Sequence, residues 1–189
     1  MCAKLLILES PGKVKKVQSF LGPDWKVVAS VGHVRDLPVK EMGVAAPDFK
    51  PHYQPTERGA DVLKRLGALA KQADVVYLAT DPDREGEAIA WHVADALKLK
   101  DAKRVTYGEI TESAVKAAVQ SPRAIDMALV AAQEGRRVLD RFCGYLVSGP
   151  LSRAVGTRLS AGRVQSPALR LVVERERAIT SFVSVTHYG

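Results

Sequence analysis

Cysteine is scarce in this sequence, with only Cys2 and Cys143 among 189 residues. They form no CxxC pair, which excludes a zinc-finger or disulfide-rich scaffold and fits a reducing cytoplasm. No apolar run is long enough to cross a membrane. The first one, residues 4–8, is too short for a signal peptide and is followed by Glu9. A GxxxxGK[ST] phosphate-binding loop is also missing, so nothing indicates ATP-driven chemistry.

Hydrophobic and charged residues are abundant in the sequence. Hydrophobic residues make up 47% of the chain and charged residues 26%, and the net charge is +7. This composition predicts a folded protein with one substantial core, and we find neither repeats nor low-complexity segments. A basic balance of this size favours a polyanionic partner such as a nucleic acid, although many basic proteins bind none.

Strand-like and helix-like segments alternate over roughly residues 1–120. Because such alternation is typical of parallel β/α units, we expect an α/β domain whose sheet is covered by helices on both faces. A Pro-rich segment at 36–56 lacks periodicity and is expected to be a surface loop. The expected strands are 4–8, 26–31, 75–79 and 104–107, and the expected helices are 12–21, 57–71, 85–97 and 111–120, the last capped by Thr111.

The pattern changes after Pro122. Long helical stretches are expected at 125–146 and 163–177, joined by an irregular link at 151–162. A new strand-like run begins only in the last few residues. We therefore predict a second, mainly α-helical region over residues 121–189.

Four carboxylates follow two of the expected strands. Glu9 follows the strand at 4–8, whereas Asp81, Asp83 and Glu85 follow the strand at 75–79. Ligand chemistry in parallel sheets gathers beyond the carboxyl ends of the strands, and clustered carboxylates need a cation to offset their repulsion. Oxygen ligands of this kind suit Mg²⁺. The plainer alternative is an acidic N-terminus for the helix at 85–97, which accounts for one or two of these acids.

The motifs around these acids resemble a known family. The acid pattern is similar to that of the Toprim domain, which topoisomerases share with bacterial primases and some nucleases. The longer string at 79–92, ATDPDREGEAIAWH, resembles bacterial type IA DNA topoisomerases more narrowly. Further segments resemble the same family in the same order: LESPGK at 8–13, SVGHVRDL at 30–37 and LSAGRVQSPALR at 159–170. The resemblance implies a Toprim domain over 1–120, followed by the first part of a helical domain that binds single-stranded DNA.

The resemblance also implies roles for individual residues. Glu9, Lys13 and Arg163 would be catalytic, and Glu9, Asp81, Asp83 and Glu85 would hold Mg²⁺. Without the resemblance, Lys13 is an ordinary helix lysine, and Arg136 with Asp140, four residues apart on one helix, is a surface ion pair. The residues that the resemblance places at DNA are Lys13, His33, Arg84, Arg136, Asp140, Arg163, Gln165 and Ser166.

The family's nucleophilic tyrosine is missing from this chain. Type IA enzymes cut DNA with a tyrosine in a Thr-Tyr-Met-Arg-Thr-Asp motif, and none of the five tyrosines has that context. We therefore expect a fragment of an enzyme that cleaves, passes and reseals one DNA strand, relaxing negative supercoils with Mg²⁺ and without ATP. The fragment is expected to be monomeric, cytoplasmic, nucleoid-associated and inactive alone. The alternatives are another Toprim enzyme, a primase or nuclease, and a non-catalytic module that binds single-stranded DNA.

Overall fold

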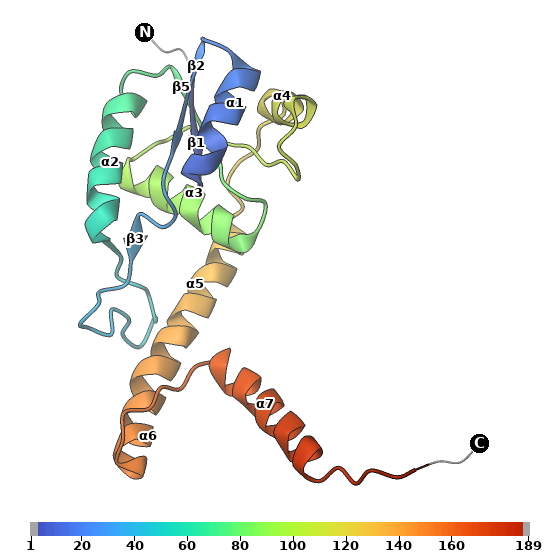
Figure 1. Ribbon diagram of the computed structural model, residues 1–189. Helices are drawn as coiled ribbons and strands as arrows, with labels where there is room; N and C mark the ends of the chain where they lie inside the picture. Colours follow the sequence, from blue (N-terminus) through green and yellow to red (C-terminus); the bar gives the residue numbers. More distant parts are fainter. Residues whose placement is uncertain (1–3, 187–189) are drawn as a thin grey trace. The chain divides into compact units, whose positions relative to one another are not determined.

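The computed structural model describes residues 4–186 and is built on a four-stranded parallel sheet (Figure 1). Its strand order is β2-β1-β5-β6, and β1 is hydrogen-bonded to both β2 and β5. Leu8, the last residue of β1, is in register with Ala29 and with Ala79, so three strands end level. The strands are β1 (Lys4–Leu8), β2 (Trp25–Ala29), β5 (Val75–Ala79) and β6 (Lys103–Arg104).

Helices cover both faces of this sheet, as the alternating pattern predicts. Successive residues of β1 point to opposite faces: Leu5 and Ile7 pack into one apolar cluster, and Leu6 and Leu8 into another. The first cluster lies under α2 (Glu57–Ala70) and α3 (Arg84–Ala96), and the second under α1 (Val14–Leu21) and α4 (Glu112–Gln120). The expected α/β fold class is therefore confirmed.

Side-chain caps begin three of these helices. Thr56 accepts a hydrogen bond from the amide of Gly59 at the start of α2, Asp83 from that of Gly86 in α3, and Thr111 from that of Ala114 in α4. These bonds satisfy amides that have no partner within the helix. The cap expected at Thr111 is confirmed.

Two of the expected strands are too long. The strand expected at 26–31 ends at Ala29, because Val31 and Gly32 have φ angles of 60° and 82°, outside the extended region. The strand expected at 104–107 consists of Lys103 and Arg104 alone. The two ends of the segment expected as a loop at 36–56 are paired with each other, since β3 (Arg35–Asp36) pairs antiparallel with β4 (Gln54–Pro55).

Beyond residue 126 most of the described chain is helical. This part contains α5 (Met127–Phe142), one π-helical segment η2 (Cys143–Val147), α6 (Ser148–Val155) and α7 (Gln165–Thr180). The expectation of an irregular link at 151–162 is wrong for its first part, since α6 runs through Val155. The strand expected at the end of the chain is not seen up to residue 186, and 187–189 lie outside the described residues.

Two compact units divide the chain between Arg136 and Arg137, inside α5. A domain boundary near residue 120 stays a prediction. None of the helices described between residues 4 and 186 is long and apolar enough to span a membrane.

Two glycines of α2 predict opposite stability changes. Alanine normally stabilises a helix interior by about 1 kcal/mol relative to glycine. At Gly59, however, a Cβ atom would overlap the carbonyl oxygen of Val34, whereas at Gly67 the nearest atom, Leu97 Cδ2, lies at 3.4 Å. We expect Gly59→Ala to lower the free energy of unfolding by about 2 kcal/mol and Gly67→Ala to leave it unchanged or raised. Urea unfolding measures both, and equal effects would contradict the close approach of α2 to Val34.

Candidate metal and DNA site

The level ends of β1 and β5 bring acidic and basic side chains to one edge of the sheet. Glu9 follows β1 directly, and Asp81 lies two residues after the end of β5. Lys13, in the 3₁₀ turn η1 (Pro11–Lys13), binds Asp81, with 2.8 Å between Nζ and Oδ1. Both side chains of this ion pair are partly exposed. The structure therefore brings together three of the residues that the sequence assigned to catalysis and metal binding.

The carboxyl of Glu9 is in an environment that disfavours its charge. Burial raises its pKa most, and the negative charges of Asp81 and Asp83 raise it further. A hydrogen bond from the backbone of Asp81 and the charge of Lys13 act in the opposite direction but do not cancel the rise. Glu9 therefore holds a proton to higher pH than an ordinary glutamate, as an acid–base group requires.

Asp83 has a structural role at the start of α3, where the plainer alternative was an acidic helix N-terminus. Its Oδ1 accepts the amide of Gly86 at 2.7 Å and so caps α3. The cap explains why an acid stands here, but it leaves the second carboxylate oxygen outside that bond. Asp83 still contributes to the negative potential at Glu9.

Glu85 is paired with a histidine. It contacts His33, with 2.5 Å between Oε1 and Nε2, and the two side chains are both partly exposed. The structure thus pairs two residues that the sequence assigned separately, His33 to DNA and Glu85 to the metal.

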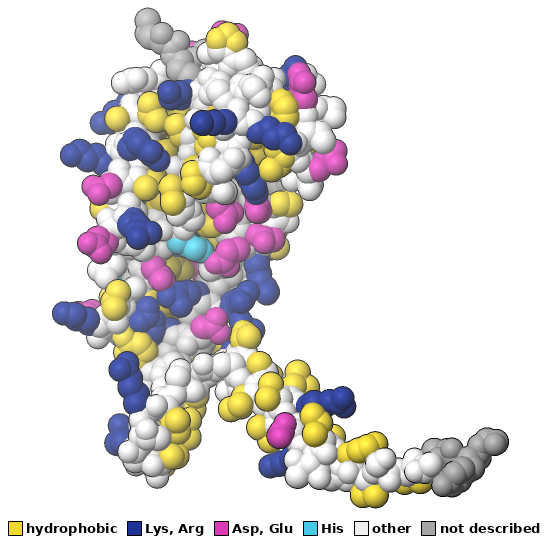
Figure 2. All heavy atoms as spheres, in the orientation of Figure 1, with side chains coloured by type: hydrophobic (Ala, Val, Ile, Leu, Met, Phe, Trp, Pro, Cys, Tyr) yellow, Lys and Arg dark blue, Asp and Glu magenta, His cyan; other side chains and the backbone are white. Residues whose placement is uncertain are grey.

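Acidic side chains gather around one histidine on the face of the molecule drawn in Figure 2.

Across residues 4–186, no group of three or more His, Cys, Asp or Glu side chains is arranged to hold a metal ion. The donors nevertheless fit a hard divalent cation, because they are carboxylate oxygens. Burial raises the pKa of Glu9 most, and the negative charges of Asp81 and Asp83 add to that rise. On this ground Glu9, Asp81 and Asp83 could hold a metal ion.

The other residues assigned to DNA lie on helix starts and on α5. Arg84 is the first residue of α3 and is exposed, and Arg136 lies in α5. Within the second unit, Arg163 donates to Asp140, with 2.8 Å between Nε and Oδ1, and this carboxylate raises the pKa of Arg163. At the start of α7, Gln165 donates to Ser160 at 2.9 Å, and the amide of Ser166 donates to the carbonyl of Gly162.

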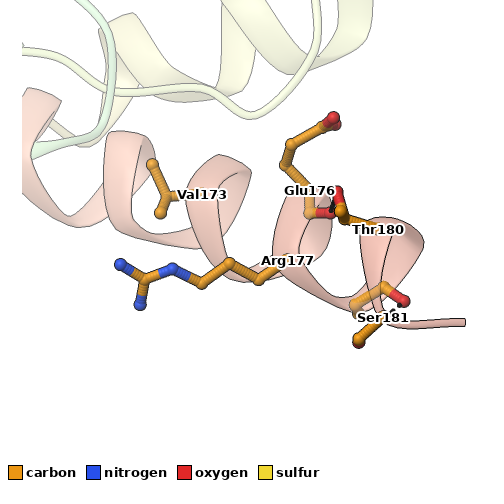
Figure 3. Close-up of a pocket in the computed structure, with 6 residues that line it drawn as sticks. Val173, Glu176, Arg177, Thr180 and Ser181 are labelled. Carbon is orange, nitrogen blue, oxygen red and sulfur yellow. Dashed lines mark hydrogen bonds between the residues drawn. The ribbon is translucent and has the colours of Figure 1, made fainter.

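A recess of about 580 Å³ runs along the last turns of α7 (Figure 3). Its labelled lining residues, among them Val173, Glu176 and Arg177, come from α7 and from Ser181 just after it. Because a single helix forms it, the recess lacks the opposing wall of a ligand site. It is a surface feature of the second unit.

Sequence reasoning missed a buried ion cluster beneath the acid site. Glu87 and Arg104 are both fully buried, and Arg104 Nε donates to Glu87 Oε2 at 2.9 Å. Arg123 also donates to Glu87, through both terminal nitrogens at 2.7 and 2.8 Å. Burial alone would raise the pKa of Glu87, but the hydrogen bonds from Arg123, Asp126 and Arg104 outweigh it and lower the pKa to about 2. Only the position of Glu87, within the acid string, was visible in the sequence.

A second missed cluster surrounds Arg35. Its guanidinium donates to Asp95 at 2.7 Å and to His92 Nδ1 at 3.1 Å, and it lies over the ring of Trp91. Burial, followed by the positive charge of Arg35, lowers the pKa of His92 to about 3, so this histidine is neutral and can accept the bond. The ring of His92 also contacts that of His33, with centroids 6.3 Å apart.

Comparisons with known proteins show the family and the fold of this chain. Residues 4–112 match the Toprim domain family, and residues 124–189 match the DNA topoisomerase family. The chain is 66% identical over 186 residues to a plasmid DNA topoisomerase I of Xylella fastidiosa (strain 9a5c), covering 98% of this chain and 28% of that protein. Full-length topoisomerase I from Thermotoga maritima is similar in structure, with a TM-score of 0.84 and 44% identity over 95% of this chain and 31% of that one.

The parallel sheet lies within residues 4–112, which match the Toprim family model and make up more than half of the chain. The chain belongs to the Toprim family. The resemblance to bacterial type IA topoisomerases, stated from the motifs, is confirmed. Toprim domains of topoisomerases generally bind metal ions. The chain spans less than a third of the length of either relative.

The raised pKa of Glu9 predicts a stability change with a definite sign. A carboxyl whose pKa is raised by folding stabilises the fold below its unfolded pKa, and this contribution is lost as pH rises through the folded pKa. We therefore expect Glu9→Gln to increase the free energy of unfolding at pH 7 relative to wild type. The difference should vanish below about pH 4, near the unfolded pKa of a glutamate.

Urea unfolding of this chain at pH 7 and pH 4 measures that difference. The matched control is Glu112→Gln, which removes an exposed carboxylate paired with Lys116 and should change stability by less than about 0.5 kcal/mol. A Glu9→Gln chain less stable than wild type at pH 7 would contradict the electrostatic account of Glu9.

Proposed function

We propose that this chain is the metal-binding and DNA-gripping part of a type IA DNA topoisomerase, an isomerase that cleaves, passes and reseals one DNA strand. The observation that carries the proposal is the group of Glu9, Lys13 and Asp81 at the carboxyl edge of the sheet. Its support is that both parts of the chain match families found in topoisomerases. The whole protein would relax negative supercoils with Mg²⁺ and without ATP.

Glu9 and Lys13 are the groups proposed to act on the reacting phosphodiester. Glu9, which holds a proton more tightly than usual, would protonate the leaving 3′ oxygen and later take the proton back. Lys13 is bound to Asp81 through a partly exposed ion pair. A DNA phosphate would draw Lys13 into a second charged contact, placing a positive charge on the phosphate to be cut.

Asp81 and Asp83, with Glu9, are proposed to hold Mg²⁺, and Glu85 stays a predicted ligand. A bound Mg²⁺ would neutralise charge on the phosphate and orient it. Asp83 would serve with the carboxylate oxygen that does not cap α3. Glu85 would have to leave its contact with His33 to join the set, and His33 would then be released toward DNA.

Single-stranded DNA is the proposed partner, in negatively supercoiled DNA for the whole protein. Arg163, held by Asp140, and the polar start of α7 at Gln165 and Ser166 would grip the sugar-phosphate chain. Arg84 and Arg136 would add phosphate contacts. A monomer acting at the nucleoid in the cytoplasm is consistent with such a substrate.

A nuclease or primase is the second candidate within the same family. Its support is the same acid site, which could activate water or a hydroxyl with two metals instead of serving a tyrosine. The match of residues 124–189 to the DNA topoisomerase family favours the first proposal. A non-catalytic single-strand-binding module describes what the chain would do by itself.

This chain should bind single-stranded DNA weakly and should not cut it. Binding is expected from the net charge of +7, and log affinity should fall linearly with log salt concentration. Lys13→Ala and Arg163→Ala should each reduce that slope by about 0.7, whereas Lys71→Ala, at the exposed C-terminal end of α2 and outside the motifs, should not. Fluorescence anisotropy at four salt concentrations measures the slopes.

The same chain is then incubated with Mg²⁺ and negatively supercoiled plasmid. Unchanged plasmid supports the proposal. Nicked plasmid would favour the nuclease, and relaxed topoisomers or DNA linked to one of the five tyrosines would show that no further tyrosine is needed.

Substitution of two acids in the full-length protein tests the metal assignment. Asp81→Asn with Asp83→Asn removes two anionic oxygen ligands while keeping the shape of the side chains. We expect relaxation to need at least about tenfold more Mg²⁺, or to be lost, because Mg²⁺ binds poorly without anionic ligands. Asp95→Asn, remote from this edge and paired with Arg35, is the control. An unchanged Mg²⁺ requirement would remove the assigned role of Asp81 and Asp83.

A further inference from the structure

Arg104 lies fully buried in the first unit, directly behind the acid site. Its guanidinium donates to five acceptors: Glu87 Oε2 at 2.9 Å, and the carbonyl oxygens of Leu78 at 3.1 Å, Thr80 at 2.8 Å, Asp81 at 2.8 Å and Val105 at 2.7 Å. A buried guanidinium is tolerated only when its donors are satisfied in this way. Four of these five bonds go to the backbone, so Arg104 does more than neutralise Glu87.

The backbone bonds of Arg104 fall where the sheet stops. β5 ends at Ala79, and the carbonyls of Thr80 and Asp81 form the turn that leads into α3. Arg104 donates to both carbonyls through separate nitrogens, Nη1 to Thr80 and Nη2 to Asp81. The two nitrogens belong to one rigid plane, so the two peptide units are held at a fixed spacing.

Close packing holds the same turn from the side of α3. A Cβ atom on Gly86 would overlap the backbone of Asp81, so the helix start and the turn touch without a side chain between them. The hydroxyl of Thr80 donates to the carbonyl of Gly86 at 2.5 Å. Asp81 therefore has its backbone clamped between Arg104 and α3, while its carboxylate is presented to Lys13.

Glu87 connects this clamp to the beginning of α5. Besides the bond from Arg104, it accepts two bonds from Arg123 and one from the amide of Asp126, at 2.7 Å. Asp126 in turn accepts the amides of Ala128 and Leu129, in the first turn of α5. Through one buried carboxylate, the acid turn and the start of α5 share a single hydrogen-bond network.

We propose that Arg104 is a positioning residue that holds the Thr80–Asp81 turn in the geometry in which Asp81 can bind a metal ion. Arg123 binds the same carboxylate, Glu87, but donates to no atom of the turn among the bonds described, so its part is to anchor the start of α5. The metal role of Asp81 rests on the proposed function. The clamping of the turn by Arg104 does not depend on it.

Replacement of Arg104 by lysine separates charge from geometry. Lysine keeps the positive charge beside Glu87, but its single nitrogen has three donors and cannot reach five acceptors. The carbonyls of Thr80 and Asp81 would lose their shared partner. The matched control is Arg123→Gln, which weakens the other contact to Glu87 while leaving the backbone pairing of residues 104 and 123 in place.

Amide hydrogen exchange, followed by NMR on this chain without metal, tests the clamp. In Arg104→Lys we expect exchange at Asp81 and Gly86 to be about tenfold faster or more, with the amides of Leu6 and Ile7 in β1 unchanged. In Arg123→Gln we expect no acceleration at Asp81 and Gly86. Unchanged exchange at these two amides in Arg104→Lys, or equal acceleration in both variants, would overturn the proposal.

Binding of Mn²⁺, an oxygen-preferring probe for the Mg²⁺ site, gives the second readout. The dissociation constant from electron paramagnetic resonance should rise about tenfold in Arg104→Lys, as is typical when a residue that orients a metal ligand is changed, and stay within about twofold in Arg123→Gln. A wild-type chain that binds no Mn²⁺ while Arg104→Lys shows the exchange change would count against the proposed metal site and leave the clamp supported. Wild-type binding that Arg104→Lys does not weaken would overturn the metal part of this inference.

Should Arg104→Lys fail to fold, the double variant Glu87→Met with Arg104→Met replaces it. Removing both charges avoids leaving either one buried without a partner, and the clamp on Thr80 and Asp81 is still lost. The same exchange and binding outcomes are expected and would be decisive in the same way.

Discussion

The parallel pairing of β1 with both β2 and β5 is the constraint on which the candidate site depends. Since Leu8 stands level with Ala29 and Ala79, the segments that follow all three strands leave the sheet at one edge. Glu9 and Asp81 are 72 positions apart in the chain and meet only through this register. Fully buried side chains on both faces of β1 hold it, because a shift by one residue would turn every apolar side chain of the strand to the wrong face.

Two kinds of electrostatic environment lie within a few residues of each other at this edge. In front, the negative charges of Asp81 and Asp83 act on Glu9 in a partly exposed cluster, and Lys13 offsets them only in part. Behind it, Glu87 is fully buried yet stays ionised, because Arg104 and Arg123 surround it. The front cluster costs stability and suits binding of a cation and a phosphate, whereas the buried cluster holds the backbone in place.

Structural and functional roles overlap at single residues here. Asp83 caps α3 and also adds to the negative potential at Glu9. Its position therefore fits both interpretations of the acid string, as an acidic helix start and as a metal site. The side chains of Glu85 and His33 are in contact, and this contact links the acid string to the segment after β2. These shared roles explain why neither interpretation of the acid string excludes the other.

The sequence alone determined the alternation of strands and helices, the cap at Thr111, the acid string and the family, because each of these is written in neighbouring residues. It overextended the strand after Trp25, since the positive φ at Val31 depends on the loop that follows and not on the β-branched side chain. From the sequence, Arg104 was predicted only as the first residue of a strand at 104–107. Only the tertiary structure decided that Arg104 lies under the acid turn, that Glu87 joins it to Arg123, and that Glu85 turns to His33. These contacts join residues 17 to 52 positions apart, and no local pattern encodes which of many charged side chains the fold brings together.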